Sequence, residues 1–406
     1  MAKENKREPI FHIVKRMNIS ESLKITLRLL AILIGMIIGA IFVILISSKS
    51  HNFFGFFGSM ASGVFSTQRK FWKYLLDASL LLGVSIALVP AFKMKFWNLG
   101  GNGQILMGCL GTCAVMYYLG DKLPDPVLWI LMLVASTGLA GIWALIPAIF
   151  KAFFKTNESL FTLMLNYIAS ILIEFFISYW YQQNQTGSMD PLVHGNLPTL
   201  GNSPFGQCIL PICLFTFVTV AVALYLHFSK HGYELEVVGE SENTARYVGV
   251  NVKAVTIRTV VMSGALCGLV GFVLSGAING MMSTNMDANM GFTGIMVAWL
   301  SHLNPVVMVF MSLFISFVTK GMAQVNEDFG FTDETLSAVI RGIIFFILIA
   351  SEFSISYKIV WREDIQKIID KLNYPFVWVA KKVEPVFVKI GDSVNKLKWK
   401  SRKEGK

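Results

Sequence analysis

Charged residues are scarce in this chain of 406 residues, of which only 15% are Asp, Glu, Lys or Arg while 54% are hydrophobic. An ordinary soluble domain carries about 25% charged residues, so this composition excludes a typical soluble enzyme. Long apolar runs stand where charge is missing, and several are long enough to span a bilayer. The composition therefore predicts an all-α, polytopic membrane protein in the cell (inner) membrane.

Clusters of residues that carry chemistry are also missing. The five cysteines, all expected to be small buried side chains, are Cys109, Cys113, Cys208, Cys213 and Cys267. Two of them share a helix face, but no histidine or further cysteine accompanies them, which makes a poor metal site. Since no His, Cys and Asp residues converge, the sequence predicts no catalytic site, no metal site and no cofactor bound by this chain.

Sequence motifs that would couple transport to a source of energy are absent as well. The chain contains no G-x-x-x-x-G-K-[ST] phosphate-binding loop. It also lacks the paired intramembrane carboxylates expected of a proton-coupled carrier. These absences favour a membrane subunit powered by a separate ATPase, and the alternative is a secondary carrier or channel that works alone.

Basic residues gather at both ends of the chain. The net charge is +10, and residues 1–28 carry seven Lys/Arg against three Asp/Glu, while residues 357–406 carry thirteen against six. By the positive-inside rule both termini should be cytoplasmic. We expect a basic segment at 1–25, a transmembrane domain at 26–353 and a basic amphipathic tail at 354–406, which forms a helix on the inner leaflet. A solvated regulatory tail is the alternative. This basic balance indicates membrane orientation and contact with membrane lipids, not nucleic-acid binding.

Apolar runs predict about ten transmembrane helices. The clearest lie near 26–48, 76–92, 104–120, 127–149, 208–228, 257–278 and 336–353. A fifth span begins near Ser159, and the eighth and ninth, before and after Pro305, are expected to include half-helices. The aromatic, glycine-rich residues 51–64 are too short to span and predict an interfacial or re-entrant piece. Gly35 and Gly39 form a G-x-x-x-G pair that favours close helix contact.

A polar stretch interrupts the apolar chain at its middle. Residues 232–249 read G-Y-E-L-E-V-V-G-E-S-E-N-T-A-R-Y-V-G. Because hydrocarbon disfavours these charges, the stretch predicts a short helix at the membrane surface or, alternatively, a solvated loop. The pattern Y-E-L-x-x-V-G-x-x-x-x-x-A-R-Y-x-G resembles the coupling loop of ABC importer permeases of the ribose/branched-chain-amino-acid/nucleoside class.

This resemblance implies that the loop at 229–256 docks into a cleft of a separate cytosolic ATPase subunit, which would hold ATP. The residues it assigns to coupling are Glu234, Gly239, Asn243, Ala245, Arg246, Tyr247 and Gly249.

Three further stretches resemble the same family. They are F-W-N-L-G-G-N-G-Q-I-L-M-G at 96–108, K-T-N-E-S-L-F-T-L-M-L-N-Y-I-A at 155–169 and G-F-T-G-I-M-V-A-W-L-S-H-L-N-P-V-V-M at 291–308. The glycines of the first stretch predict a break in the helix. This break lies either within the membrane, where surrounding protein satisfies its backbone, or in an ordinary turn between two helices. Asn102 stands where the family has an acidic residue. In the second, Thr156 or Asn157 predicts a helix cap. The proposed translocation-path residues are Asn98, Gly101, Gln104, Asn166 and Tyr167.

The resemblance covers most of residues 75–353 and is strongest to the nucleoside branch. It implies three partners: the ATPase, a second permease subunit, homologous or identical, and a lipid-anchored or periplasmic substrate-binding protein. The expected substrate is a nucleoside or similar small polar solute. The same class of importer also carries simple sugars such as ribose, and riboflavin, and both remain alternatives.

Two charges are placed within predicted spans. Glu174 in the fifth span and Arg341 in the tenth are expected at similar depth near the outer mouth. Since each would be costly alone in hydrocarbon, they predict an intramembrane ion pair. The alternative is that each side chain reaches the outer interface separately.

Overall fold

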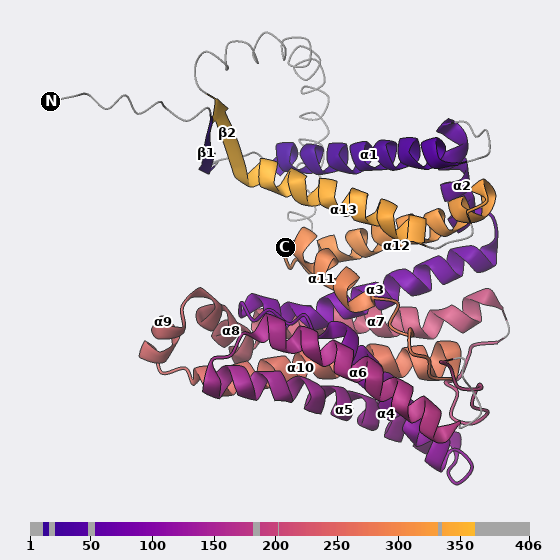
Figure 1. The fold of residues 1–406 in the computed structure, drawn as a ribbon. Coiled ribbons are helices and arrows are strands. Elements are labelled where there is room, and N and C mark those ends of the chain that lie inside the picture. Colours follow the sequence, from indigo (N-terminus) through magenta and orange to yellow (C-terminus); the bar gives the residue numbers. More distant parts are fainter. Residues whose placement is uncertain are drawn as a thin grey trace, which may run out of the picture. The chain divides into compact units, whose positions relative to one another are not determined.

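A computed structural model of the chain describes residues 11–15, 21–47, 53–181, 187–201, 203–331 and 335–361. These residues are mainly helical (Figure 1) and form two compact units, residues 1–57 with 329–406 and residues 58–328. In the described ranges, eight helices are long and apolar enough to cross a membrane. The prediction of an all-α multi-pass membrane protein is confirmed, and the helix count is roughly as expected once shorter helices are included.

In the first unit, α1 (Glu21–Ile46) packs along α13 (Thr335–Ser356). A Cβ added to Gly35 would lie 3.4 Å from the Cα of Ile344, and one added to Gly39 would lie 3.0 Å from the Cγ2 of Ile340. The small residues therefore allow the close contact that their spacing predicts. Arg28 and Glu352 join the same helices by an ion pair of 2.5 Å.

The same unit contains the strands of a small sheet. Strand β1 (Phe11–Lys15) pairs antiparallel with β2 (Tyr357–Trp361), and Phe11 lies opposite Trp361. The helix expected for the tail is thus wrong at residues 357–361, which form a strand ladder with residues 11–15. Residues 362–406 lie outside the described residues.

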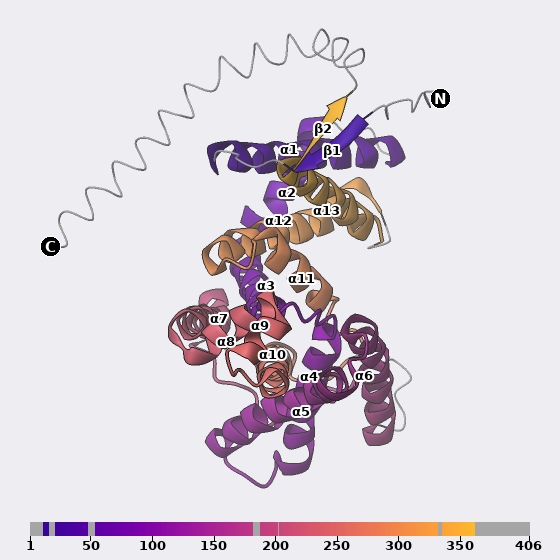
Figure 2. The same ribbon diagram turned by 90° about the vertical axis from the view of Figure 1, so that its left-hand side faces the viewer.

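The second unit is a helical bundle around α10 (Val252–Val273), which a π-helical segment, η1 (Leu274–Asn279), extends. Helix α10 contacts α3, α4 and α5, and the two views show it running beside α4 and α5 (Figures 1 and 2). The surrounding helices are α3 (Gln68–Lys93), α4 (Gly101–Leu119), α5 (Asp125–Phe154), α6 (Glu158–Trp180) and α7 (Pro204–Phe228).

Glycine brings α10 close to its neighbours. A Cβ on Gly268 would lie 2.6 Å from the carbonyl oxygen of Ser136 in α5, so no larger residue fits at this crossing. The hydroxyl of Ser136 donates to the carbonyl oxygen of Gly268 at 2.6 Å. The close contact between the two backbones and this hydrogen bond together hold α5 against α10.

Three more helices complete the bundle: α2 (Phe53–Phe65), α11 (Met290–Leu300) and α12 (Pro305–Phe329). Helix α2 has only 13 residues, as the short aromatic stretch predicts, and Gly63 in it lies against Gly321 of α12. Helix α11 has 11 residues, which fits the half-helix expected before Pro305.

Helix α4 begins halfway along the bundle. The α10–η1 helix has 28 residues and is therefore about 42 Å long at 1.5 Å per residue. Ser263, eleven residues from its start and thus about 17 Å along it, accepts a hydrogen bond from Asn98 at 3.3 Å. Non-helical residues after α3 therefore bring the chain back into the bundle before α4 starts at Gly101.

Two sequence predictions need correction in this unit. The glycine-rich stretch does not stay outside helix, because Gly101 and Gly103 form the first turn of α4, where neighbouring side chains hold the backbone. Cys213 is exposed, whereas the other four cysteines are buried. Cys213 lies on an outward face of α7, where an apolar thiol can face lipid without needing burial in protein.

Candidate functional site

The polar loop between α7 and α10 folds into two short helices, α8 (Lys230–Glu240) and α9 (Glu242–Tyr247). Ser229 caps α8 by accepting from the N–H of Gly232 at 3.0 Å. Ser241 caps α9 by accepting from the N–H of Thr244 at 3.3 Å. The helical prediction for this loop is therefore right, and its position at the membrane surface stays a prediction. We call residues 230–249 the α8–α9 loop.

Polar contacts fasten α8 to the bundle. Glu234, whose side chain is only 15% exposed, binds Arg258 of α10 at 2.7 Å. Glu236 binds Lys93 at the end of α3 at 2.9 Å. A Cβ on Gly239 would overlap the carbonyl oxygen of Lys93, so the absence of a side chain there lets α8 lie directly against α3. These contacts hold the loop in one position relative to two helices of the bundle, α3 and α10.

His231 adds a buried joint between the same helices. Its Nδ1 lies 2.9 Å from the hydroxyl of Tyr225 in α7, and its Nε2 lies 3.0 Å from the hydroxyl of Thr259 in α10. Both ring nitrogens are therefore occupied, and α7, α8 and α10 meet at one imidazole. The sequence did not predict a role for His231, because only the fold brings Tyr225 and Thr259 next to its ring.

Helix α9 presents its polar face outward. Tyr247 is 93% exposed, and Arg246 is exposed and paired with Glu242 at 3.2 Å. Ala245 is fully buried and faces the bundle. Of the seven predicted coupling residues, those open to a partner are Asn243, Arg246, Tyr247 and Gly249, and those that hold the loop in place are Glu234, Gly239 and Ala245.

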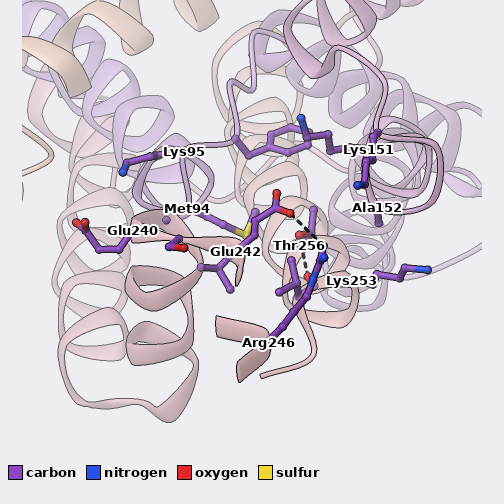
Figure 3. Close-up of a pocket in the computed structure, with 15 residues that line it drawn as sticks. Met94, Lys95, Lys151, Ala152, Glu240, Glu242, Arg246, Lys253 and Thr256 are labelled. Carbon is purple, nitrogen blue, oxygen red and sulfur yellow. Dashed lines mark hydrogen bonds and ion pairs between the residues drawn. The ribbon is translucent and has the colours of Figure 1, made fainter. Parts of the chain in front are cut away.

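A pocket of about 350 Å³ lies between this loop, the end of α5 and the start of α10. In Figure 3, Arg246 reaches Glu242 beside the pocket, while Lys95 and Lys253 extend to opposite sides. The charged residues that line it are Lys95, Lys151, Lys155, Arg246, Lys253, Glu240 and Glu242. With five cations and two anions, the opening beside α9 is predominantly basic.

A network of buried amides surrounds the start of α4. Asn98 and Gln104 exchange hydrogen bonds at 3.2 and 3.1 Å. Asn166 of α6 accepts from the N–H of Gly103 at 2.9 Å and donates to the carbonyl oxygen of Leu99 at 2.8 Å. The interpretation that a polar side chain deep in the fifth span bonds to a neighbouring helix is confirmed for Asn166.

The predicted path residues thus separate into two groups. Asn98, Gly101, Gln104 and Asn166 are buried together, whereas Tyr167 is 62% exposed on the outward face of α6. A role for any of them in contacting the solute stays a prediction. The predicted cap is confirmed, since Asn157 accepts from the N–H of Leu160 at 3.2 Å.

Asn102 ties α4 to α11. Its side-chain oxygen accepts from the N–H of Gly291 at 2.6 Å, and its amide nitrogen donates to Asn289 at 3.3 Å. The two helices therefore begin at the same place in the bundle. An uncharged amide suits this position because it must both accept and donate, which an ionised carboxylate cannot do.

The structure describes the side chain of only one of the two residues of the predicted ion pair. Glu174 is exposed on α6, and among the described residues it has no hydrogen-bond or ion-pair partner. The side chain of Arg341 lies outside what the structure describes. The pair between Glu174 and Arg341 stays a prediction.

Acidification is expected to loosen the α8–α9 loop. Burial and, to a smaller degree, the charge of Arg258 lower the pKa of His231 below 6.5. Its neutral form is therefore favoured in the folded state, and the stability that depends on it is lost as the pH falls from 6.5 towards the lowered pKa. When the purified protein is unfolded by heat at pH values from 7.5 down to 5, the unfolding midpoint should fall more steeply with decreasing pH for the wild type than for His231→Gln.

The exposed His194 provides the control for this experiment. Its side chain is 53% exposed and contacts Asp121 at 3.1 Å, away from the α8–α9 loop. In His194→Gln the unfolding midpoint should fall with decreasing pH as steeply as in the wild type. Equal slopes for His231→Gln and the wild type would contradict a buried neutral His231.

Comparisons with known proteins agree with this arrangement. Residues 71–349 match the family model described as "Branched-chain amino acid transport system / permease component". The chain is 28% identical to the nucleoside ABC transporter permease protein NupB of Lactococcus lactis, covering 80% of this chain and 91% of the relative. It is 28% identical to the guanosine ABC transporter permease protein NupP of Bacillus subtilis, covering 81% and 94%.

A third relative is the glucose ABC transporter permease protein TsgB13 of Haloferax volcanii, 27% identical over 75% of this chain and 82% of the relative. The family match covers more than half of the chain, from within α3 to within α13, and includes every helix from α4 to α12. The apolar helices, the anchored polar loop and this match together lead to one conclusion. The chain belongs to the family of branched-chain amino acid transport system permease components.

Proposed function

We propose that this protein is the membrane-spanning subunit of an ATP-driven importer whose ATPase is a separate subunit. The observation that carries the proposal is the α8–α9 loop, which is fastened to three helices and presents Arg246 and Tyr247 to the outside. An exposed aromatic residue beside an arginine is typical of the centre of a protein interface. A loop fixed to the bundle can transmit movement between an ATPase and the membrane helices.

The orientation follows from charge. Lys and Arg dominate at both ends of the chain, so both termini are assigned to the cytoplasm. An even number of crossings then returns the chain to that side, and the α8–α9 loop faces the cytoplasm, where an ATPase can reach it. A second permease subunit, homologous or identical, and a lipid-anchored or periplasmic binding protein complete the proposed complex.

The proposed cargo is a nucleoside or a similar neutral polar solute. Two relatives carry nucleoside or guanosine in their names, while a third is named for glucose. The polar groups around the start of α4 are mainly amides, which offer hydrogen bonds without charge and suit sugar hydroxyls and base edges. Ribose and riboflavin are the alternative cargoes.

The test combines purification with uptake. An affinity-tagged chain solubilised from its own membrane should retain a cytosolic protein that contains a phosphate-binding loop. The reconstituted complex should take up labelled guanosine only with ATP, with ribose and riboflavin as competitors in parallel samples. Uptake by the purified chain alone, without ATP or an ATPase, would instead support a secondary carrier or channel.

A further inference from the structure

Paired and unpaired charges line the basic pocket beside the α8–α9 loop. Arg246 is paired with Glu242 at 3.2 Å, and Lys151 is paired with Glu158 of α6 at 2.7 Å. These pairs leave three lining lysines whose ammonium groups make no hydrogen bond or ion pair with a described residue: Lys95, Lys155 and Lys253. Because Glu240 is the one remaining acidic residue of the lining, the pocket keeps an excess of positive charge.

The ends of two helices account for part of this charge. Lys95 and Lys155 follow the carboxyl ends of α3 and α5, where a helix dipole favours a cation. Both residues have left-handed backbone, with φ of 58° and 52°, at helix ends where glycine is usual. The dipoles do not explain why further unpaired positive charge gathers around the same hollow. Like charges repel one another, and a bound anion would remove that repulsion.

The pocket lies at one end of the membrane bundle. Helices α3 and α5 end beside it, and α10 begins there at Val252. All three are long and apolar enough to cross a membrane, so the pocket lies at the level where they leave the hydrocarbon. Phospholipid headgroups occupy this level, and basic pockets between membrane helices bind the headgroups of anionic lipids.

An apolar face of α5 adjoins the pocket. The end of this helix exposes Phe150, Phe153 and Phe154, and such a patch on a spanning helix is suited to contact with lipid chains. The Nζ of Lys253 lies 4.5 Å from the centroid of the Phe153 ring. Lys253 therefore borders both the pocket and the apolar face of α5, as a headgroup-binding lysine should.

We propose that the basic pocket is a binding site for a phosphate group, which joins the α8–α9 loop to the end of α5. Its volume of about 350 Å³ falls within the range of about 300–1,000 Å³ that is typical of small-molecule sites. The phosphate comes either from the headgroup of an anionic phospholipid or from a soluble phosphate compound, and the place of Lys253 favours the lipid. Arg246 of α9 and Lys151 of α5 line the same pocket (Figure 3), so an occupant would hold α9 against α5.

Native mass spectrometry of the purified full-length chain tests binding, with phosphatidylglycerol as the anionic lipid and phosphatidylcholine as the zwitterionic one. The wild type should retain phosphatidylglycerol in preference. Replacing Lys155 and Lys253 together by Gln should weaken this binding about thirtyfold, or about 2 kcal/mol, because each basic residue at an anionic headgroup contributes about 1 kcal/mol. Replacing both by Arg keeps the charge and should keep the affinity within about threefold of the wild type.

Two exposed cations at the far ends of the same helices supply the matched control. Arg69 lies in the first turn of α3, and Lys122 lies just before α5, so neither borders the pocket. The double variant Arg69→Gln, Lys122→Gln removes the same amount of charge and should bind phosphatidylglycerol as the wild type does. An equal loss in the two double Gln variants would reveal unspecific attraction and overturn the proposal.

Hydrogen exchange of the amides at residues 241–249 shows whether the occupant holds the loop and where it comes from. In phosphatidylcholine nanodiscs, adding phosphatidylglycerol should slow this exchange in the wild type and not in the Lys155 and Lys253 double Gln variant. Slower exchange with inorganic phosphate or guanosine monophosphate, and without phosphatidylglycerol, would support a soluble occupant of the same site. If neither kind of phosphate slows exchange, the proposal is wrong.

The rival occupant is an acidic segment of the ATPase. If the Lys155 and Lys253 double Gln variant loses ATPase co-purification in phosphatidylcholine, while phosphate compounds change nothing in the wild type, the pocket belongs to the ATPase interface and the proposal falls. The binding and exchange measurements use the chain without ATPase or solute. Failure of the proposed import function would therefore leave their results unchanged.

Discussion

Charge reversal at Arg246 is expected to abolish ATP-driven uptake while leaving the membrane bundle folded. Arg246→Glu would place two acidic residues one helical turn apart, because its present partner is Glu242 at 3.2 Å. It would also invert the charge beside Tyr247, the most exposed aromatic side chain of the loop. Uptake and solute-stimulated ATP hydrolysis should both fall to background, and the binding protein should still bind the reconstituted complex.

Tyr247→Ala tests the same surface without a change of charge. Loss of a central aromatic contact typically costs an interface 2 kcal/mol or more, so ATPase co-purification should fall by roughly thirtyfold or more. Tyr179→Ala, at a side chain 61% exposed on α6, is the matched control and should keep ATPase binding. Normal uptake in both the Arg246 and Tyr247 variants would show that α9 is not the docking surface.

Gly239→Trp is not an equivalent test, although the resemblance places Gly239 among the coupling residues. Even a Cβ there would overlap the carbonyl oxygen of Lys93, so an indole would push α8 away from α3. Loss of transport in that variant would report displacement of the loop. Substitutions at exposed positions of α9 test docking of the ATPase without displacing the loop.

Asn166→Leu is expected to destabilise the protein by about 2–6 kcal/mol. The change leaves the N–H of Gly103 and the carbonyl oxygen of Leu99 without their partner, and each unpaired buried group costs about 1–3 kcal/mol. The motif alone predicts a lining residue whose loss spares the fold, and the two bonds change that expectation. Thermal unfolding in detergent and the yield of folded protein would measure the effect.

The neighbouring Tyr167 supplies the comparison. Its side chain is 62% exposed, so Tyr167→Leu should leave the unfolding midpoint within measurement error. If Tyr167 lines the path, uptake should fall in this stable variant. An Asn166→Leu protein as stable as the wild type would contradict the bracing role of the amide network.

Hydropathy and local motifs were sufficient to predict the membrane spans and the position of the polar loop. Each span depends mainly on the length of its own apolar run, and Ser229, Ser241 and Asn157 act on neighbours within three residues. The stretches at 96–108 and 155–169, which resemble the family, also contain the side chains of the amide network. Local chemistry therefore accounts for most of the fold that could be predicted.

Contacts between distant residues explain what could not be predicted. The start of α4 is fixed by Asn166, 63 positions away from Gly103, and by Gly291, 189 positions away from Asn102. The sequence also could not show that Glu234 turns inward to Arg258 while Tyr247 turns outward, because both lie in the same polar stretch. The side of a short helix that faces the bundle depends on packing, which has no local signature.

The pairing of α1 with α13 has a consequence for biosynthesis. Arg28 and Glu352 are 324 positions apart, so the first apolar helix is made long before its partner exists. At roughly 5–20 residues per second, α1 waits about 16–65 s in the bilayer with a polar guanidinium and a glycine stripe uncovered. The insertion machinery, or lipid headgroups, must shield it during that interval. A chain that stalls before residue 335 carries an unmatched first helix and is a natural target for membrane proteases.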